Sequence, residues 1–204
     1  MSNNKLNPIR FVLFLAVCLC TVPVLNAQQM QSPGNKERAI NLSIEIDAPV
    51  DKVWDQWTTT ESISKFFAPS SRIELKPMGH FDIYFFPNAP EGSRGAEGNF
   101  ILGVQEKQML SFTWDAPPQW PEIRKQRTFV TVRFHKLSEK KSQVTLMHTG
   151  WGNSAEWDAV YNYFISAWGD VVLPFLKYSI EVKPVDWTDF PKKLPAGLKP
   201  AARL

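Results

Sequence analysis

The stretch "VTLMHTGWGNSAEWDAVYNYFISAWGDVVLPFLKYSIE", residues 144–181, decides the fold of this chain. Its first residues alternate in character, which predicts a strand whose apolar face carries Val144, Leu146 and His148. After a glycine turn, aromatic and aliphatic residues recur every three or four positions. This spacing predicts one long helix from Ala155 to about residue 182, with a kink or an end of the regular helix at Pro174.

The chain before this stretch indicates one strand, two short helices and a run of further strands. "RAINLSIEID" (38–47) alternates as a half-buried strand does. "APVDKVWDQWTTTESISKFF" (48–67) has helical spacing that is interrupted at residues 58–60, and it begins with a proline suited to a first helical turn. The strand-like segments that follow have no helices between them, which favours an antiparallel meander; they are "SRIELK", "GHFDIYFF", "EGNFILGV", "QMLSFTW", "TFVTVRFHKL" and "SQVTLMHTG".

These elements together predict an α+β fold. A single long helix is available to cover the apolar face of the sheet, and sheets twist. We therefore expect a curved antiparallel sheet of about six or seven strands wrapped around the long C-terminal helix, with two short helices after the first strand. Residues 38–182 form this domain, and residues 183–204, rich in proline and without periodicity, are expected to be an extended or mobile tail.

The first residues predict a signal peptide. A polar segment with two basic residues precedes the apolar run "FVLFLAVCLCTVPVL", and Ala27 is a small residue suited to cleavage. A membrane anchor is the alternative, but the run of 15 residues contains Pro23 and is shorter than the roughly 20 that a spanning helix needs. We expect residues 1–27 to be removed, residues 28–37 to be a flexible leader, and the mature protein to be periplasmic or secreted without stable membrane insertion.

The composition of the mature chain argues against several classes of function. Cleavage removes two of the 23 basic residues and none of the 20 acidic ones, so the net charge falls from +3 to +1, too little to hold nucleic acid. Both cysteines lie in the removed segment, so no disulfide and no thiolate are expected. The three histidines show no metal-ligand spacing. We therefore expect neither a metal nor a cofactor.

Four segments carry a resemblance to a known family: "IEIDAPVDKVWDQWTTTESISKFF", "GHFDIYF", "EGNFILGVQEKQMLSFTW" and "VTLMHTGWG", the last leading into the helix with Trp168. Over residues 38–182 the sequence resembles the START-like or SRPBCC superfamily, with its helix-grip fold. Within it, the chain is similar to homologues of the C-terminal domain of the heat-shock-protein ATPase activator. The superfamily includes lipid and hormone carriers, aromatases and cyclases, and chaperone regulators, so the resemblance implies a fold rather than one function. The export signal argues against the chaperone-regulator role, whose partner is cytosolic.

The predicted geometry favours an internal cavity. A concave sheet and one helix, filled with rigid rings, do not meet everywhere, and the resemblance implies a cavity as well. Strand alternation places Phe100 and Leu102 on one inward face. We predict ten side chains for the binding of a small apolar ligand, and no catalytic residue: Trp57, Phe67, Phe85, Phe100, Phe112, Trp114, His148, Tyr161, Phe164 and Trp168.

Two of the aromatic positions keep alternative interpretations. His148 either is satisfied by a neighbouring group in the core, or orients a ligand's carbonyl or hydroxyl, or acts as an acid–base group. Trp120 either anchors its proline-rich loop or gates a pocket. Three functions follow: a binding module for a small apolar molecule, a cyclase-like or hydrolytic enzyme that uses His148, or a protein-interaction domain that works through its outer face or tail, whose partner the sequence does not name.

Overall fold

The fold is known from a computed structural model that describes residues 37–188, 195 and 197–204. The predicted signal peptide, and the predicted leader up to residue 36, lie outside the described residues. Within the described residues, no helix has both the length and the apolar character needed to cross a bilayer.

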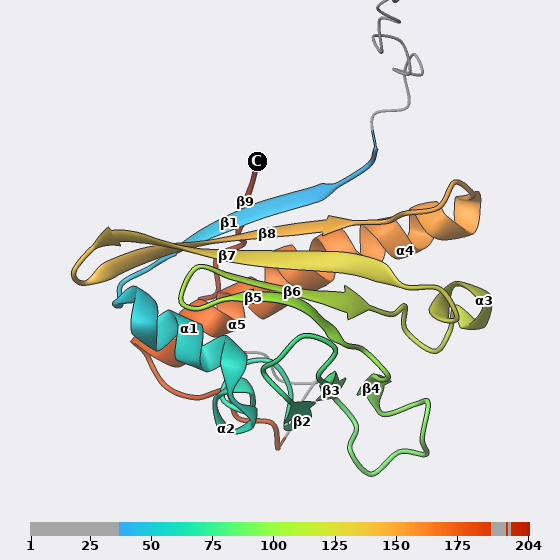
Figure 1. The fold of residues 1–204 in the computed structure, drawn as a ribbon, viewed down its shortest axis with the longest axis horizontal. Coiled ribbons are helices and arrows are strands. Elements are labelled where there is room, and N and C mark those ends of the chain that lie inside the picture. Colours follow the sequence, from blue (N-terminus) through green and yellow to red (C-terminus); the bar gives the residue numbers. More distant parts are fainter. Residues whose placement is uncertain (1–36, 189–194, 196) are drawn as a thin grey trace, which may run out of the picture. The chain divides into compact units, whose positions relative to one another are not determined.

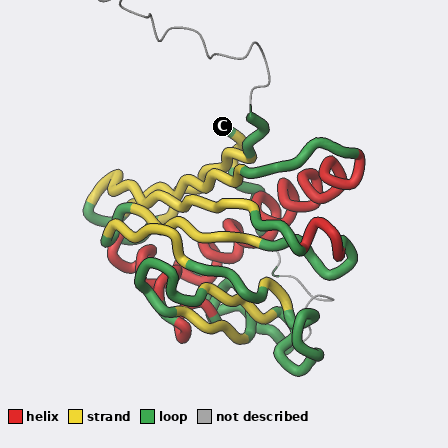
Figure 2. Tube along the Cα trace, turned by 45° about the vertical axis from the view of Figure 1, so that its right-hand side comes forward, coloured by secondary structure: helices red, strands yellow, loops and turns green. Residues whose placement is uncertain are grey.

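A six-stranded antiparallel sheet forms the main wall of the domain (Figures 1 and 2). The predicted α+β architecture, with an antiparallel sheet against a long C-terminal helix, is confirmed. In spatial order the strands are β5 (Ile101–Gln105), β6 (Met109–Trp114), β7 (Thr128–Ser138), β8 (Lys141–Thr149), β1 (Ile40–Ile46) and β9 (Ala202–Arg203).

The remaining strands form a separate sheet of three, in the order β2-β3-β4. They are β2 (Ser70–Ile73), β3 (Phe81–Tyr84) and β4 (Gly95–Ala96). An isolated bridge between His80 and Phe100 links this part of the chain to the large sheet. Gly98, at a φ of +68° that few other residues adopt, turns the chain between β4 and β5. The meander is therefore divided between two sheets, and the opening between them becomes important for the site.

The two short helices form where the sequence predicts them. Pro49 precedes α1 (Val50–Thr58), and α1 packs against β7 and β8. Thr59 ends α1 and caps α2 (Thr60–Ile63), because its hydroxyl accepts a hydrogen bond of 3.1 Å from the backbone N–H of Ser62. A further short helix, α3 (Pro121–Arg124), begins directly after Trp120, in the proline-rich loop.

The long helix is continuous but contains a π-helical segment. It consists of α4 (Ala155–Ser166), η1 (Ala167–Val172) and α5 (Leu173–Glu181), and it runs along one face of the large sheet (Figure 1). In η1 the N–H of Leu173 donates to the carbonyl of Trp168, one residue further back than in an α-helix. The next residue is Pro174, which has no N–H, so the carbonyl of Gly169 receives no bond from within the helix. The predicted kink is thus a widened turn before the proline.

The end of the chain supplies the missing donor. The N–H of Ala201 donates to the carbonyl of Gly169 at 2.8 Å, and β9 pairs with β1 opposite Leu42 and Ser43. Nearer α5, the N–H of Val185 donates to the carbonyl of Lys65 at 2.8 Å. The described part of the tail is therefore extended and bonded to the domain, a docking that the sequence did not predict.

The inward face of β5 differs from the prediction. Ile101 is fully buried, whereas Leu102 is 41% exposed, and Phe100 points out of the core and lies beside His80. Residues opposite one another in an antiparallel pair point to the same face, and Ile101 lies opposite the buried Phe112. The register with β6, and a bulge directly after Ile101, decide this orientation, so the alternation in β5 alone was misleading.

Candidate functional site

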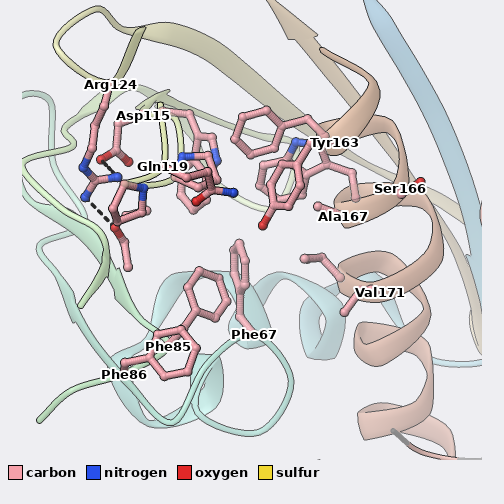
Figure 3. Close-up of a pocket in the computed structure, with 18 of the residues that line it drawn as sticks. Phe67, Phe85, Phe86, Asp115, Gln119, Arg124, Tyr163, Ser166, Ala167 and Val171 are labelled. Atoms are coloured by element: carbon pink, nitrogen blue, oxygen red, sulfur yellow. Dashed lines mark hydrogen bonds and ion pairs between the residues drawn. The ribbon is translucent and has the colours of Figure 1, made fainter. Parts of the chain in front are cut away.

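A cavity of about 790 Å³ opens between the long helix, the end of β6, the second sheet and the segment after α2 (Figure 3). Such a volume lies within the range of roughly 300–1,000 Å³ that is common for small-molecule sites. Its lining is mainly aromatic and aliphatic: Phe67, Phe85, Phe86, Ser93, Gly95, Ala96, Trp114, Asp115, Pro117, Pro118, Gln119, Arg124, Tyr163, Phe164, Ser166, Ala167, Trp168, Asp170, Val171 and Val172.

Three large rings from three separate segments form the inner end of the cavity. The ring centroids of Phe67 and Trp114 are 5.7 Å apart, those of Phe67 and Trp168 also 5.7 Å, and those of Trp114 and Trp168 5.1 Å. All three side chains are nearly inaccessible to solvent. Rings in this arrangement are rigid, and they leave an apolar surface that a ligand can contact without displacing a hydrogen-bonded group.

A buried ion pair lies at another part of the lining. Arg124 Nη1 is 2.7 Å from Asp115 Oδ2, and the side chain of Asp115 is only 1% exposed. The amide of Asn99 donates to Asp115 Oδ1 at 2.9 Å, and Arg124 Nη2 donates to the carbonyl of Gly95 at 2.7 Å. Burial raises the pKa of the Asp115 carboxyl, although the Asn99 bond and the charge of Arg124 oppose that rise. Both charged groups therefore have their partners within the protein.

Polar side chains also lie at the open side of the cavity. The hydroxyl of Tyr163 and the amide of Gln119 both point toward the cavity (Figure 3), and both side chains are exposed. Trp120 packs against the Tyr163 ring, with centroids 5.6 Å apart, although it does not line the cavity itself. This contact fixes α4 against the loop before α3, and it supports the interpretation of Trp120 as an anchor.

His148 lies behind the cavity, in a chain of hydrogen bonds. Trp168 Nε1 donates to His148 Nδ1 at 3.0 Å, and His148 Nε2 is 2.7 Å from Thr128 Oγ1. Because an indole N–H can only donate, Nδ1 carries the lone pair and Nε2 carries the hydrogen. The hydroxyl of Thr128 then donates to the carbonyl of Trp114 at 3.0 Å. This chain joins η1 to β8, β7 and β6.

The environment of His148 keeps its ring neutral. The side chain is completely buried, and burial lowers the pKa of the imidazole well below its ordinary value of 6.5. No carboxylate hydrogen bond to either ring nitrogen is present among the described residues. The geometry corresponds to the first of the three interpretations, a histidine satisfied within the core.

A match to a protein-family model agrees with the fold described above. The model described as "Activator of Hsp90 ATPase homolog 1-like protein" matches residues 47–176. The chain belongs to this family. A search of curated protein sequences found no match. The predicted resemblance to homologues of the heat-shock-protein ATPase activator is confirmed.

Several solved structures share the fold of this family member. The Aha1 dimer from Colwellia psychrerythraea has a TM-score of 0.55 and 16% identity, over 72% of this chain and 98% of that one. An HSP90 activator from Plasmodium falciparum has a TM-score of 0.54 and 18% identity, over 71% of this chain and 94% of that one. CalU16 from Micromonospora echinospora has a TM-score of 0.52 and 22% identity, over 75% and 80%. At these identities the likeness concerns the fold alone.

In this member of the family, the cavity brings together half of the ten predicted ligand-binding residues. Those that line it are Phe67, Phe85, Trp114, Phe164 and Trp168. The other five lie outside its lining, and they are Trp57, Phe100, Phe112, His148 and Tyr161. A ligand role for any of them stays a prediction.

Four of the residues outside the lining have clear structural roles. Trp57 packs behind Phe67 at 5.6 Å between centroids, and Phe112 packs behind Trp114 at 5.7 Å. The hydroxyl of Tyr161 donates to the carbonyl of Ala39 at 3.0 Å, which holds the start of the domain against α4. His148 has the hydrogen bonds given above. These side chains support the wall of the cavity from behind.

The sequence reasoning missed the polar part of the site. Asp115 and Gln119 follow β6, and Arg124 ends α3. Ser166 ends α4 and Asp170 lies in η1, so no short motif contains these residues. One weak signal was present, since "WDAPPQWPEIR" places charged residues close to buried aromatic ones. Among the described residues, no group of three histidine, cysteine, aspartate or glutamate side chains could hold a metal ion.

Proposed function

We propose that this protein is exported and that it binds a small, largely apolar molecule in the cavity between the long helix and the two sheets. The observation that carries the proposal is a cavity of about 790 Å³ whose inner end is formed by Phe67, Trp114 and Trp168. The fold of the family is consistent with ligand binding. The proposal that the protein is exported rests on the apolar run at residues 11–25 and on the small residue Ala27, which suits cleavage.

The energy available is enough for a useful affinity. Burying about 500 Å² of apolar ligand surface at ~25 cal/mol per Å² contributes about 12 kcal/mol before the costs of association. If those costs are about 4 kcal/mol, the low end of their range, about 8 kcal/mol remains, and −8.2 kcal/mol corresponds to a dissociation constant of about 1 μM. The ligand needs no charge to reach this range.

The two other functions receive less support. An enzyme that used His148 as an acid–base group would need a second polar group beside it inside the cavity. The ring instead is buried between Trp168 and Thr128. For a protein-interaction role, the outer face of the large sheet offers Phe129, which is 45% exposed, and Met147, which is 44% exposed. Each of them lies opposite a threonine on the neighbouring strand. This face is mixed rather than apolar.

A pocket-filling substitution tests ligand binding. Ala167 lines the cavity from η1 (Figure 3), so Ala167→Trp places an indole in the space that a ligand would occupy. We expect the parent to enhance the fluorescence of the apolar dye N-phenyl-1-naphthylamine with a micromolar dissociation constant, and Ala167→Trp to weaken that binding at least tenfold. Asn162→Trp introduces the same indole at an exposed site on α4 outside the lining, and it should bind like the parent.

The folded state of both variants is checked by circular dichroism and thermal melting. Equal dye binding by the parent and by a folded Ala167→Trp protein would show that this cavity is not the binding site. Failure of the parent itself to bind this dye, and to respond to a thermal-shift screen of apolar metabolites, would refute the proposed function.

A further inference from the structure

The charges in the cavity lining leave no cation free for an anionic ligand. Three residues of the lining have charged side chains: Asp115, Arg124 and Asp170. The first two form the 2.7 Å ion pair, and Arg124 also donates to the carbonyls of Ala116 and Gly95. Asp170 is exposed at the rim, without an ion pair to another described residue. The lining therefore carries a net charge of −1.

Recruiting Arg124 to an anionic ligand would disrupt a satisfied pair. Asp115 is 1% exposed and Arg124 is 15% exposed, so a carboxylate that took over the guanidinium would leave a buried charge without its partner. A neighbouring guanidinium is no alternative. Arg127 donates to the backbone carbonyls of Arg124 and Glu97, at 2.7 and 3.2 Å, and is thereby held in place. Asp115, Arg124 and Arg127 are consequently all bonded to partners within the protein, and neither guanidinium is free to bind a ligand.

Uncharged groups at the mouth remain available. The Tyr163 hydroxyl and the Gln119 amide point toward the cavity (Figure 3), and neither makes a hydrogen bond to another described residue. Together they offer O–H and N–H donors and two oxygen acceptors. The contact between Trp120 and the Tyr163 ring holds the tyrosine in position, at 5.6 Å between centroids. Both groups stand opposite the apolar end, which Phe67 helps to form.

We propose that the cavity selects an uncharged amphiphile over an anionic one, and that the apolar part of this ligand contacts the inner rings while its hydroxyl or carbonyl group is bound at the mouth by Tyr163 and Gln119. This inference rests on the proposed function and adds the class of ligand to it. The ligand enters with its apolar end first and keeps its polar group near solvent, where hydrogen bonding to the two side chains replaces water. Fatty acids and other anionic amphiphiles are selected against by the carboxylate of Asp170 and by the occupied guanidinium of Arg124.

Probes with one alkyl chain and different head groups test the inference. At pH 7.5, 1-decanol, methyl decanoate and decanoate are titrated against the protein–dye complex described above. We expect the alcohol and the ester to displace the dye at concentrations at least tenfold below those needed for decanoate. Tyr163→Phe should weaken decanol binding roughly threefold to tenfold, the effect of losing one neutral hydrogen bond, once the dissociation constant of the dye for this variant has been measured and used in the comparison.

Two further variants separate head-group recognition from the solubility of the probes. Gln119→Met should weaken binding of the ester and the alcohol by a similar factor. Asp170→Asn should strengthen decanoate binding relative to decanol binding. Asn162→Trp, outside the lining, serves again as the control and should alter none of these values.

The outcomes distinguish this inference from the proposed function. Binding of the dye and of all three probes, with decanoate as tight as decanol, would overturn the preference for uncharged over anionic ligands while leaving the cavity as a binding site. Tyr163→Phe and Gln119→Met proteins that both bind decanol like the parent would overturn the role of the mouth. Absence of binding by the dye and by every probe would refute the proposed function itself.

Discussion

Lowering the pH should destabilise this domain through one residue, His148. Its Nδ1 accepts the Trp168 N–H at 3.0 Å, so a proton added to Nδ1 would place two donors against one another inside the core. Complete burial disfavours the charged ring further, and the pKa of His148 is lowered well below 6.5. In the unfolded chain the ring titrates at about 6.5. Between these two values, the unfolded state binds a proton that the folded state does not.

The sign and the size of the effect follow from linkage. Where the unfolded state binds more protons, stability rises with pH, so stability is lost as the pH falls below about 6.5. The slope approaches about 1.4 kcal/mol per pH unit. Between pH 7.5 and pH 5.5, His148 should therefore reduce the free energy of unfolding by at most about 1.4 kcal/mol, and the full amount is reached if the folded pKa lies well below 5.5.

Urea unfolding followed by fluorescence at a series of pH values measures this loss. His148→Gln keeps an acceptor and a donor for the neighbouring side chains but does not titrate, so its free energy of unfolding should lack this component. His135→Gln is the matched control, since that side chain is exposed on β7, and it should follow the parent. If His148→Gln loses as much stability as the parent over this pH range, the neutral, buried imidazole is not the cause and the reasoning is wrong.

The remaining predictions concern the two ends of the chain. Deletion of residues 200–204 removes β9 and leaves the buried carbonyl of Gly169 without its donor, so the free energy of unfolding should fall by about 1–3 kcal/mol; an unchanged urea midpoint would show that the tail docking contributes nothing. Expression of the full chain in a bacterial host should yield an exported protein that begins at Gln28, as read by intact-mass measurement of the periplasmic and medium fractions. A chain that starts at Met1 in the cytosol would contradict the predicted cleavage after Ala27.

Much of the fold follows from the sequence, because local periodicity records which side of an element is buried. The alternation up to His148 and the helical spacing after Ala155 predicted β8, the long helix and the inward direction of the histidine, and burial agrees with them. The helical spacing after Pro49 likewise predicted α1, and the interruption near Thr59 predicted the break before α2. Each of these features is decided within about 20 residues.

Other features depend on partners that are distant in the sequence, and only the tertiary structure decided them. Phe100 faces outward because the pairing of β5 with β6 sets the register, which no alternation within β5 can specify. Gly169 has a free carbonyl because of Pro174, but its donor comes from Ala201, across a segment without periodicity.

The cavity is the strongest case of this dependence. Its polar groups come from the loop after β6, from α3 and from the π-helical segment, and the distances between them exist only after the two sheets and the long helix have packed. The sequence alone indicated that rings such as Trp114 and Phe112 are buried. Packing determined that Trp114 borders an open space and that Phe112 fills the wall behind it. Burial is a property of each side chain and its face, whereas a void is a property of how whole elements meet.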